Sequence, residues 1–216
     1  METIKRNRIA MKKILYILNF LPLCILAQIG VGTDAPTALL EIKSDPTGIP
    51  ALALTPQITP KGSATGQMAV IDNKLYLFEE ERGKWLSVEQ SILEYGRLGF
   101  GSDPSEIEYG GGDLQNGPIM PFDGTIVSIS ISATLDNNNR EIGLFLNGNL
   151  VPNDNTNVNQ DGVFLLHPTT LSYKNSKYNV DFNSGDMISM SLLDPSVNDV
   201  DDLIVSLVIK FRKDNP

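Results

Sequence analysis

The sequence predicts an all-β protein with a C-terminal jelly-roll β-sandwich, a small N-terminal β-meander and a short neck helix. The strongest observation is the segment Gly124 to Leu135 (GTIVSISISATL), where apolar residues alternate with serine and threonine. A two-residue period places one set on each face of a strand. The segment Gly185 to Leu192 (GDMISMSL) repeats the pattern. One face of each strand is therefore apolar and the other is small and hydroxylated.

Turn-forming residues separate many further short apolar runs in the C-terminal part. Asn147–Gly148 is a strong hairpin signal because both residues tolerate positive φ, and Asn183 to Asp186 forms another turn. Many short strands joined by such turns favour a sandwich or jelly roll. The expected strands are 119–122, 125–135, 141–146, 149–151, 163–167, 170–173, 178–182, 187–193 and 203–212.

A smaller β-structure is expected before this domain. Met68 to Ile71, Lys74 to Phe78 and Lys84 to Val88 read as three short strands with tight turns between them. A meander of this size is marginally stable alone, so it needs another surface to pack on. The stretch before it, from residue 28, is rich in Gly, Pro and Thr, which breaks helices.

The segment Val88 to Gly99 (VEQSILEYGRLG) is the one expected helix after the leader. Its length of about two turns excludes a coiled coil, so we interpret it as a neck. The predicted organisation is a signal peptide (1–27), a Gly/Pro-rich segment with the hairpin module (28–88), the neck helix (89–98) and the jelly-roll head (99–216).

The N-terminal leader has the layout of a secretory signal peptide. A basic region that ends at Lys13 precedes the apolar run Ile14 to Ala27, which is too short to span a bilayer. Translation could start at Met1 or at Met11. The alternative is a lipoprotein anchored through Cys24, although Leu23 stands where a lipobox has a small residue. We expect a secreted or cell-surface protein, in the periplasm or outside the outer membrane, with no membrane span after signal removal.

Charge and cysteine content narrow the classes of partner. The leader carries five basic residues and one acid, which is a net charge of +4. The whole chain has a net charge of −9, so the chain without its leader has a net charge of −13. This charge excludes nucleic acid and anionic membranes as partners, because both require a basic face. Cys24 is the only cysteine, so the exported chain has no disulfide and depends on its core or on oligomerisation.

Two parts of the chain resemble known families. The start QIGVGTDAPTALLEIKSD, followed by ATGQMAVIDNKLYLFEEERGKWLSV with Leu75, Tyr76 and Trp85, resembles N-terminal modules of exported Bacteroidetes fibre or adhesin proteins and phage tail-fibre segments. It covers about sixty residues. This resemblance implies lineage rather than activity.

The C-terminal part resembles jelly-roll heads of the tumour-necrosis-factor and complement globular-head superfamily, including bacterial and phage-fibre relatives. The resemblance implies a compact trimer at the tip of a stalk that binds a ligand. The chain lacks a collagen repeat and has few aromatics in its last strand. The matching segments are Met120 to Ser132, Glu141 to Val151, Phe182 to Leu193 and Leu203 to Phe211.

Acidic loops supply the weak candidates for a binding site. The loop Asn153 to Gly162 contains Asp154 and Asp161 among several amide oxygens, which calcium would accept. The loop lacks the terminal glutamate of an EF-hand, so a solvated hairpin loop is the favoured interpretation. A second cluster, with the same alternative, comprises Asp199, Asp201 and Asp202. We expect no cofactor and no metal, with calcium as the alternative.

Other reactive or aromatic residues have a simpler structural interpretation. Trp85, the single tryptophan, could stack on a sugar but more often closes a hairpin by packing. His167 is the single histidine, which by itself forms neither a zinc cluster nor a triad. The run Tyr109 to Gly112 lacks the context of a phosphate loop.

These observations favour a non-enzymatic function. We expect an exported adhesion or fibre-tip protein whose jelly-roll head forms a homo-oligomer, most simply a trimer, and binds a cell-surface or glycan ligand. The serine face of Gly124 to Leu135 motivates the oligomer, because small side chains let another sheet approach closely. A carbohydrate-binding module is the first alternative, and a hydrolase of unknown type is the second.

Overall fold

The computed structural model describes residues 29–31, 38, 40–43, 48, 50–97, 107–109, 117–135, 139–153, 156–193 and 200–216. The chain divides into two compact units, Met1–Leu54 and Thr55–Pro216. The predicted leader, including Cys24, lies outside the described residues. In the first unit, β1 (Ile29–Val31) and β2 (Leu40–Ile42) pair in parallel.

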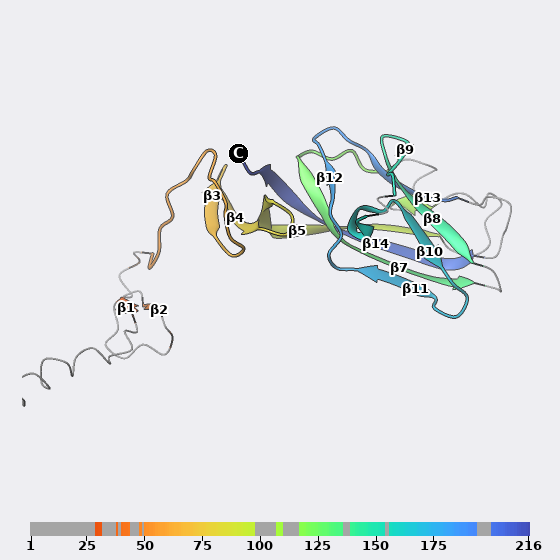
Figure 1. Ribbon diagram of the computed structural model, residues 1–216, viewed down its shortest axis with the longest axis horizontal. Coiled ribbons are helices and arrows are strands. Elements are labelled where there is room, and N and C mark those ends of the chain that lie inside the picture. Colours follow the sequence, from red (N-terminus) through yellow and green to blue (C-terminus); the bar gives the residue numbers. More distant parts are fainter. Residues whose placement is uncertain are drawn as a thin grey trace, which may run out of the picture. The chain divides into compact units, whose positions relative to one another are not determined.

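The second unit is a β-sandwich, and this confirms the predicted all-β class (Figure 1). Its larger sheet has eight strands and its smaller sheet has four. In order across the larger sheet lie β11 (Ser172–Asn175), β7 (Gly124–Leu135), β14 (Val200–Asp214), β5 (Lys84–Arg97), β4 (Lys74–Glu79) and β3 (Met68–Ile71), while β12 (Val180–Phe182) also pairs with β7 and β6 (Glu108–Tyr109) with β5.

The smaller sheet covers one face of the larger one. It contains β10 (Val163–Leu166), β8 (Arg140–Leu146) and β13 (Ile188–Leu192), with β9 (Asn149–Leu150) paired to β8. The chain crosses between the sheets after β7, β10, β12 and β13, as jelly-roll connections do. A 3₁₀ turn, η2 (Val158–Gln160), precedes β10.

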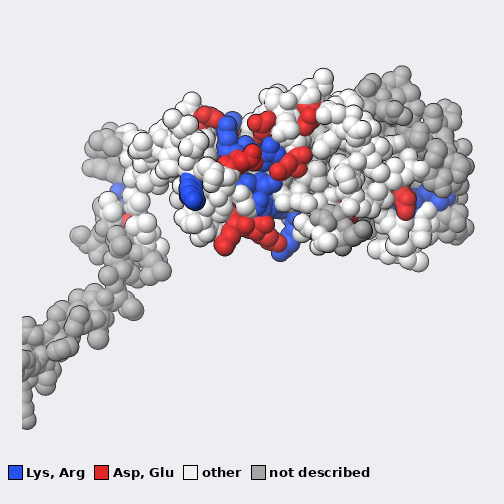
Figure 2. Space-filling view, turned by 45° about the horizontal axis from the view of Figure 1, so that its top comes forward, with Lys and Arg blue, Asp and Glu red and all other residues white. Residues whose placement is uncertain are grey.

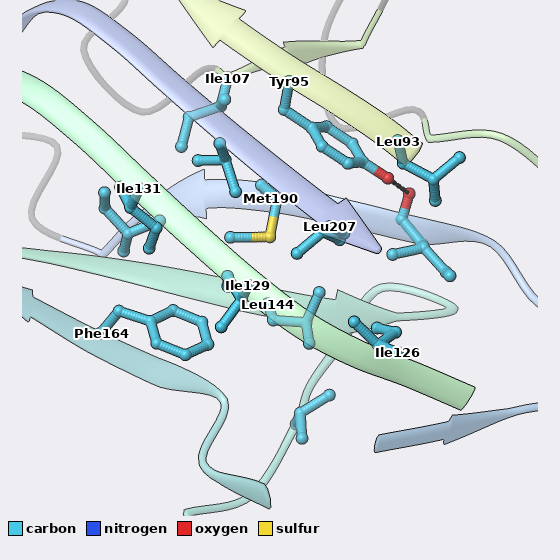
Figure 3. Packing of buried hydrophobic residues seen from close by; sticks show 14 of the residues in the cluster. Leu93, Tyr95, Ile107, Ile126, Ile129, Ile131, Leu144, Phe164, Met190 and Leu207 are labelled. Atoms are coloured by element: carbon cyan, nitrogen blue, oxygen red, sulfur yellow. Dashed lines mark hydrogen bonds between the residues drawn. The ribbon is translucent and has the colours of Figure 1, made fainter. Parts of the chain in front are cut away.

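The hydrophobic core lies between the two sheets. Figure 3 shows Ile129 and Leu207 of the larger sheet facing Leu144 and Met190 of the smaller one. These four side chains are at most 1% exposed. A second, smaller cluster joins the meander strands and contains Ala69, Ile71, Tyr76, Phe78 and Trp85.

The alternation in β7 has the predicted consequence. Ile129 and Ile131 are buried in the core, whereas Ser130 and Ser132 are exposed on the outer face of the larger sheet. Each of these residues pairs with β14 on one side and with β11 on the other. The strand is therefore central in its sheet, and its two faces differ as the sequence predicts.

The predicted neck helix is wrong, because Lys84–Arg97 forms one continuous strand, β5. Its C-terminal half alternates, with Leu93 and Tyr95 buried and Ile92 and Glu94 exposed. The partner strand β14 pairs with it from Lys84 to Arg97 and supplies hydrogen bonds that an isolated two-turn helix would have to provide alone. The same strand pairs with β4 of the meander at Ser87 and with β6 at Tyr95.

Candidate functional site

The acidic candidates do not form a metal site within the described residues. Asp154 and Asp199 lie outside them. Asp161 follows η2 and is half-buried, and its backbone carbonyl accepts a 2.5 Å hydrogen bond from the hydroxyl of Tyr178. Burial raises the pKa of Tyr178 far above its usual range, so this hydroxyl stays protonated as a donor.

The second acidic cluster lies at the start of β14. Asp201 pairs with Thr134 of β7, and exposed Asp202 has a left-handed φ of 49° at an irregularity in the register. No group of three or more His, Cys, Asp or Glu residues is arranged to hold a metal ion in the described part of the chain. The calcium alternative therefore finds no ligand cluster there.

Trp85 is buried instead of lying on the surface. Its side chain is 2% exposed, it packs on Phe78 with ring centroids 5.3 Å apart, and its Nε1 donates to the carbonyl of Pro60 at 3.0 Å. The ring therefore has no open face on which a sugar could stack. This is the packing arrangement that the sequence analysis set against a sugar contact.

His167 and Tyr109 occupy unrelated parts of the head. The exposed ring of His167 lies 2.9 Å from the amide oxygen of Asn139. Tyr109 is half-buried and packs on Tyr95 with ring centroids 5.2 Å apart. Gly110 to Gly112 lie outside the described residues.

The structure instead brings charged residues together where the meander meets the head, and Figure 2 shows acidic and basic side chains gathered on this surface. At its centre is Asp181 of β12. Both carboxylate oxygens accept from Lys84 Nζ, at 2.6 and 2.7 Å, and Arg212 Nη1 lies 3.1 Å from Oδ2. The hydroxyl of Thr125 donates to Oδ1 at 2.6 Å. We call Lys84, Thr125, Asp181 and Arg212 the Asp181 cluster.

A second set of ion pairs lies beside this cluster. Arg82 pairs with Glu79, and its Nη2 donates to the carbonyls of Val127 at 3.3 Å and Tyr178 at 3.2 Å. Its buried Nε is the one buried side-chain polar atom without a hydrogen-bond partner among the described residues. Lys177 pairs with Glu81 at 3.1 Å on the exposed rim.

Two hollows open between these charges. The larger, of about 330 Å³, is lined by Val151, Pro152, Asn153, Gln160, Asn179, Val180 and Asp181. The smaller, of about 160 Å³, is lined by Glu81, Arg82, Asn157, Asn159, Lys177 and Asn179. Asn179 lines both, so the two hollows adjoin at this residue. We call them the paired hollows.

Sequence reasoning identified only part of this site. The polar loop Asn153 to Gly162 does contribute amides to the paired hollows, whereas Asp161, the expected acid of this loop that the structure describes, lines neither of them. Arg82, Lys84 and Asp181 were missed as site residues. Lys84 and Asp181 are 97 positions apart, and no local pattern joins them. The burial of Lys84, which is 7% exposed, is visible only in the structure.

Within the part of the chain that the structure describes, no helical segment has the length and hydrophobicity needed to span a bilayer. Comparison of the chain with protein-family models, with curated proteins and with solved structures finds no match.

Proposed function

We propose that the protein is an exported, non-enzymatic adhesion or fibre-tip protein whose β-sandwich head assembles into a homotrimer and binds a ligand. The observation that carries the proposal is the outer face of the larger sheet. Along its strands this face is built of small hydroxylated and exposed aliphatic side chains, which let a second copy approach closely. Its exposed members include Ile92, Ser130, Ser132, Ser172 and Ile204.

Charge complementarity favours a second copy of this chain as the occupant of that face. Glu94, Ser206, Ser130 and Lys174 form one row across β5, β14, β7 and β11. The acid and the base are exposed at opposite ends of the row, and uncharged serines lie between them. A neighbouring copy can therefore place its Lys174 against Glu94 of the first, which gives a directional contact that can close into a ring.

The neighbouring rows supply apolar area. Ile92 and Ile204 are 57% and 53% exposed, and Val208, which pairs with Ile92 across the two strands, is half-buried. Exposed aliphatic side chains beside small hydroxylated ones are typical of a surface that another subunit covers. The resemblance to trimeric jelly-roll heads supports three copies rather than two.

Light scattering coupled to size-exclusion chromatography of the full chain tests the proposal. We expect a trimer at micromolar concentration, and a monomer would overturn the proposal, while a stable dimer would overturn the three-fold assembly. Glu94→Lys or Lys174→Glu alone should raise the dissociation constant about tenfold or more, because like charges then meet. The double exchange should restore assembly. Lys61→Glu, on an exposed loop of the meander, is the matched control.

A further inference from the structure

The amide side chains of the paired hollows have fixed orientations. The Oδ1 of Asn153 accepts from the backbone N–H groups of Gly162 and Val163 at 3.1 and 3.0 Å. The Oδ1 of Asn157 accepts from the backbone N–H of Asn159 at 3.1 Å. Only an oxygen can accept from these donors, so the Nδ2 group of each amide occupies the other position.

The same reasoning fixes two more amides. Lys84 Nζ donates to the Oδ1 of Asn179 at 3.1 Å. Asn175 uses its Oδ1 to accept from the backbone N–H of Lys177 at 2.9 Å, so its Nδ2 donates to the Oδ1 of Asn159 at 3.1 Å. The side-chain oxygens of the lining residues Asn153, Asn157, Asn159 and Asn179 therefore all accept hydrogen bonds from groups of the protein itself.

The walls of the paired hollows consequently present donors. Within the described residues, the Nδ2 groups of Asn153, Asn157, Asn159 and Asn179 donate to no acceptor. The carboxylates in the walls are already engaged, Asp181 by the Asp181 cluster and Glu81 by Lys177. A ligand that fits these walls must be rich in acceptors.

The two hollows differ in a way that narrows the ligand class. The larger has an apolar wall of Val151, Pro152 and Val180 beside its amides, and its volume is at the lower end of small-molecule sites. This combination suits a sugar ring, whose C–H groups need an apolar surface and whose hydroxyl oxygens need donors. The smaller hollow contains Lys177, whose ammonium group gives two of its three N–H donors to the exposed Glu81, so its third donor suits a ligand carboxylate.

We infer that the paired hollows bind a sugar that carries a carboxylate, with the ring in the larger hollow and the carboxylate in the smaller one. The inference deepens the proposed function and rests on the head being a ligand-binding module. It does not depend on the oligomer, because every residue of the site belongs to one copy of the chain.

Glucuronate is the probe, and glucose and acetate are the two comparison ligands. Glucose lacks the carboxylate, and acetate lacks the sugar ring. The full chain is titrated with each ligand, and binding is measured by calorimetry and by the side-chain amide NMR signals of the lining asparagines. We expect glucuronate to bind at least about tenfold more tightly than glucose or acetate. Equal binding of glucose would overturn the anionic part of the inference, and equal binding of acetate would overturn the sugar part. No response to any probe would overturn the site.

Asn157→Asp and Asn153→Asp separate recognition from loop structure. Each carboxylate still accepts from the same backbone N–H groups, but the Nδ2 donor is replaced by a negative oxygen. We expect glucuronate affinity to fall about tenfold with folding unchanged. Asn73→Asp, an exposed meander-turn residue that lines neither hollow, should bind as the parent chain does. Unchanged affinity in both site variants would contradict the inference, and light scattering on the same samples shows separately whether the oligomer persists.

Discussion

The hydroxyl of Tyr95 donates a 2.8 Å hydrogen bond to the backbone carbonyl of Ile188 and so links the two sheets of the sandwich through the core (Figure 3). Tyr95 belongs to β5 and Ile188 to β13, and both are at most 1% exposed. A buried polar contact of this kind is satisfied only when the sheets are in register, so it fixes their relative position as well as adding stability.

Tyr95→Phe should destabilise the fold by about 1–3 kcal/mol, because the carbonyl of Ile188 loses its side-chain donor in an apolar environment. Urea unfolding followed by fluorescence measures the change. Tyr109→Phe is the matched control, since Tyr109 packs on the same ring and its hydroxyl makes no hydrogen bond to the described residues. Equal destabilisation by both variants would show that the loss is not specific to the hydrogen bond between Tyr95 and Ile188.

Stability should decline at alkaline pH. Burial raises the pKa of Tyr95 and of Tyr178 far above the usual value of about 10. Above pH 10 the unfolded chain releases these protons while the folded chain retains them, so stability is full below about pH 10 and falls as the pH rises further. Urea midpoints between pH 8 and 11.5 test this. Tyr95→Phe should show a shallower decline, and an unchanged slope would contradict the assignment.

Removing the carboxylate of the Asp181 cluster should lower the free energy of unfolding more than removing one of its two cations. Asp181→Ala leaves Lys84 and Arg212, which are 7% and 9% exposed, without their shared acceptor. We expect a loss of about 2–3 kcal/mol, which is below the range for fully buried pairs because the Asp181 side chain is 41% exposed.

Lys84→Met should cost only about 1–2 kcal/mol, since Arg212 and Thr125 still satisfy the carboxylate and the methionine fills the space. Thermal and urea unfolding of both variants give the comparison. A larger loss for Lys84→Met than for Asp181→Ala would show that the lysine, rather than the carboxylate, holds the cluster together.

Gly124→Ala should be strongly destabilising. A Cβ on Gly124 would lie 2.6 Å from the backbone carbonyl oxygen of Lys210 and 2.3 Å from the ring of Phe182. Because the first of these is backbone, the strand must shift, at a cost of about 1–3 kcal/mol. Gly96→Ala is the contrast, because its Cβ would meet only the Leu203 carbonyl at 3.4 Å. Gly96→Ala should be neutral or stabilising by up to about 1 kcal/mol, and its unfolding midpoint should therefore not fall.

Local alternation predicted most strands of the head, but the expected strand 119–122 forms only an isolated bridge at Ile119, and β6 was not predicted. Nor could alternation identify the distant strand that pairs with β5. The alternation in Gly124–Leu135 reports a buried face directly, because core burial follows the two-residue period. The stretch from Val88 to Arg97 contains good helix formers, and a helix was predicted there. Pairing with β14, more than a hundred positions later, makes it a strand, since tertiary hydrogen bonds and burial outweigh local propensity.

The candidate site was predictable only as a polar loop. Asn153, Asn157 and Asn159 belong to the loop that the sequence analysis singled out, but their orientation depends on donors from Gly162, Val163 and Asn175. Their placement beside Arg82 and Lys84 depends on the meander packing against the head. No pattern along the chain encodes either relationship.

The sequence by itself determined the all-β class, most strand positions and the small hydroxylated face of β7, because side-chain periodicity and turn chemistry are local properties. The tertiary structure alone decided that β5 is a strand, that Asp181 meets Lys84 and Arg212, and that the side-chain oxygens of Asn153, Asn157, Asn159 and Asn179 accept hydrogen bonds from within the protein. These features arise from pairings between segments far apart in the chain, where backbone hydrogen bonds and buried charges must be satisfied together.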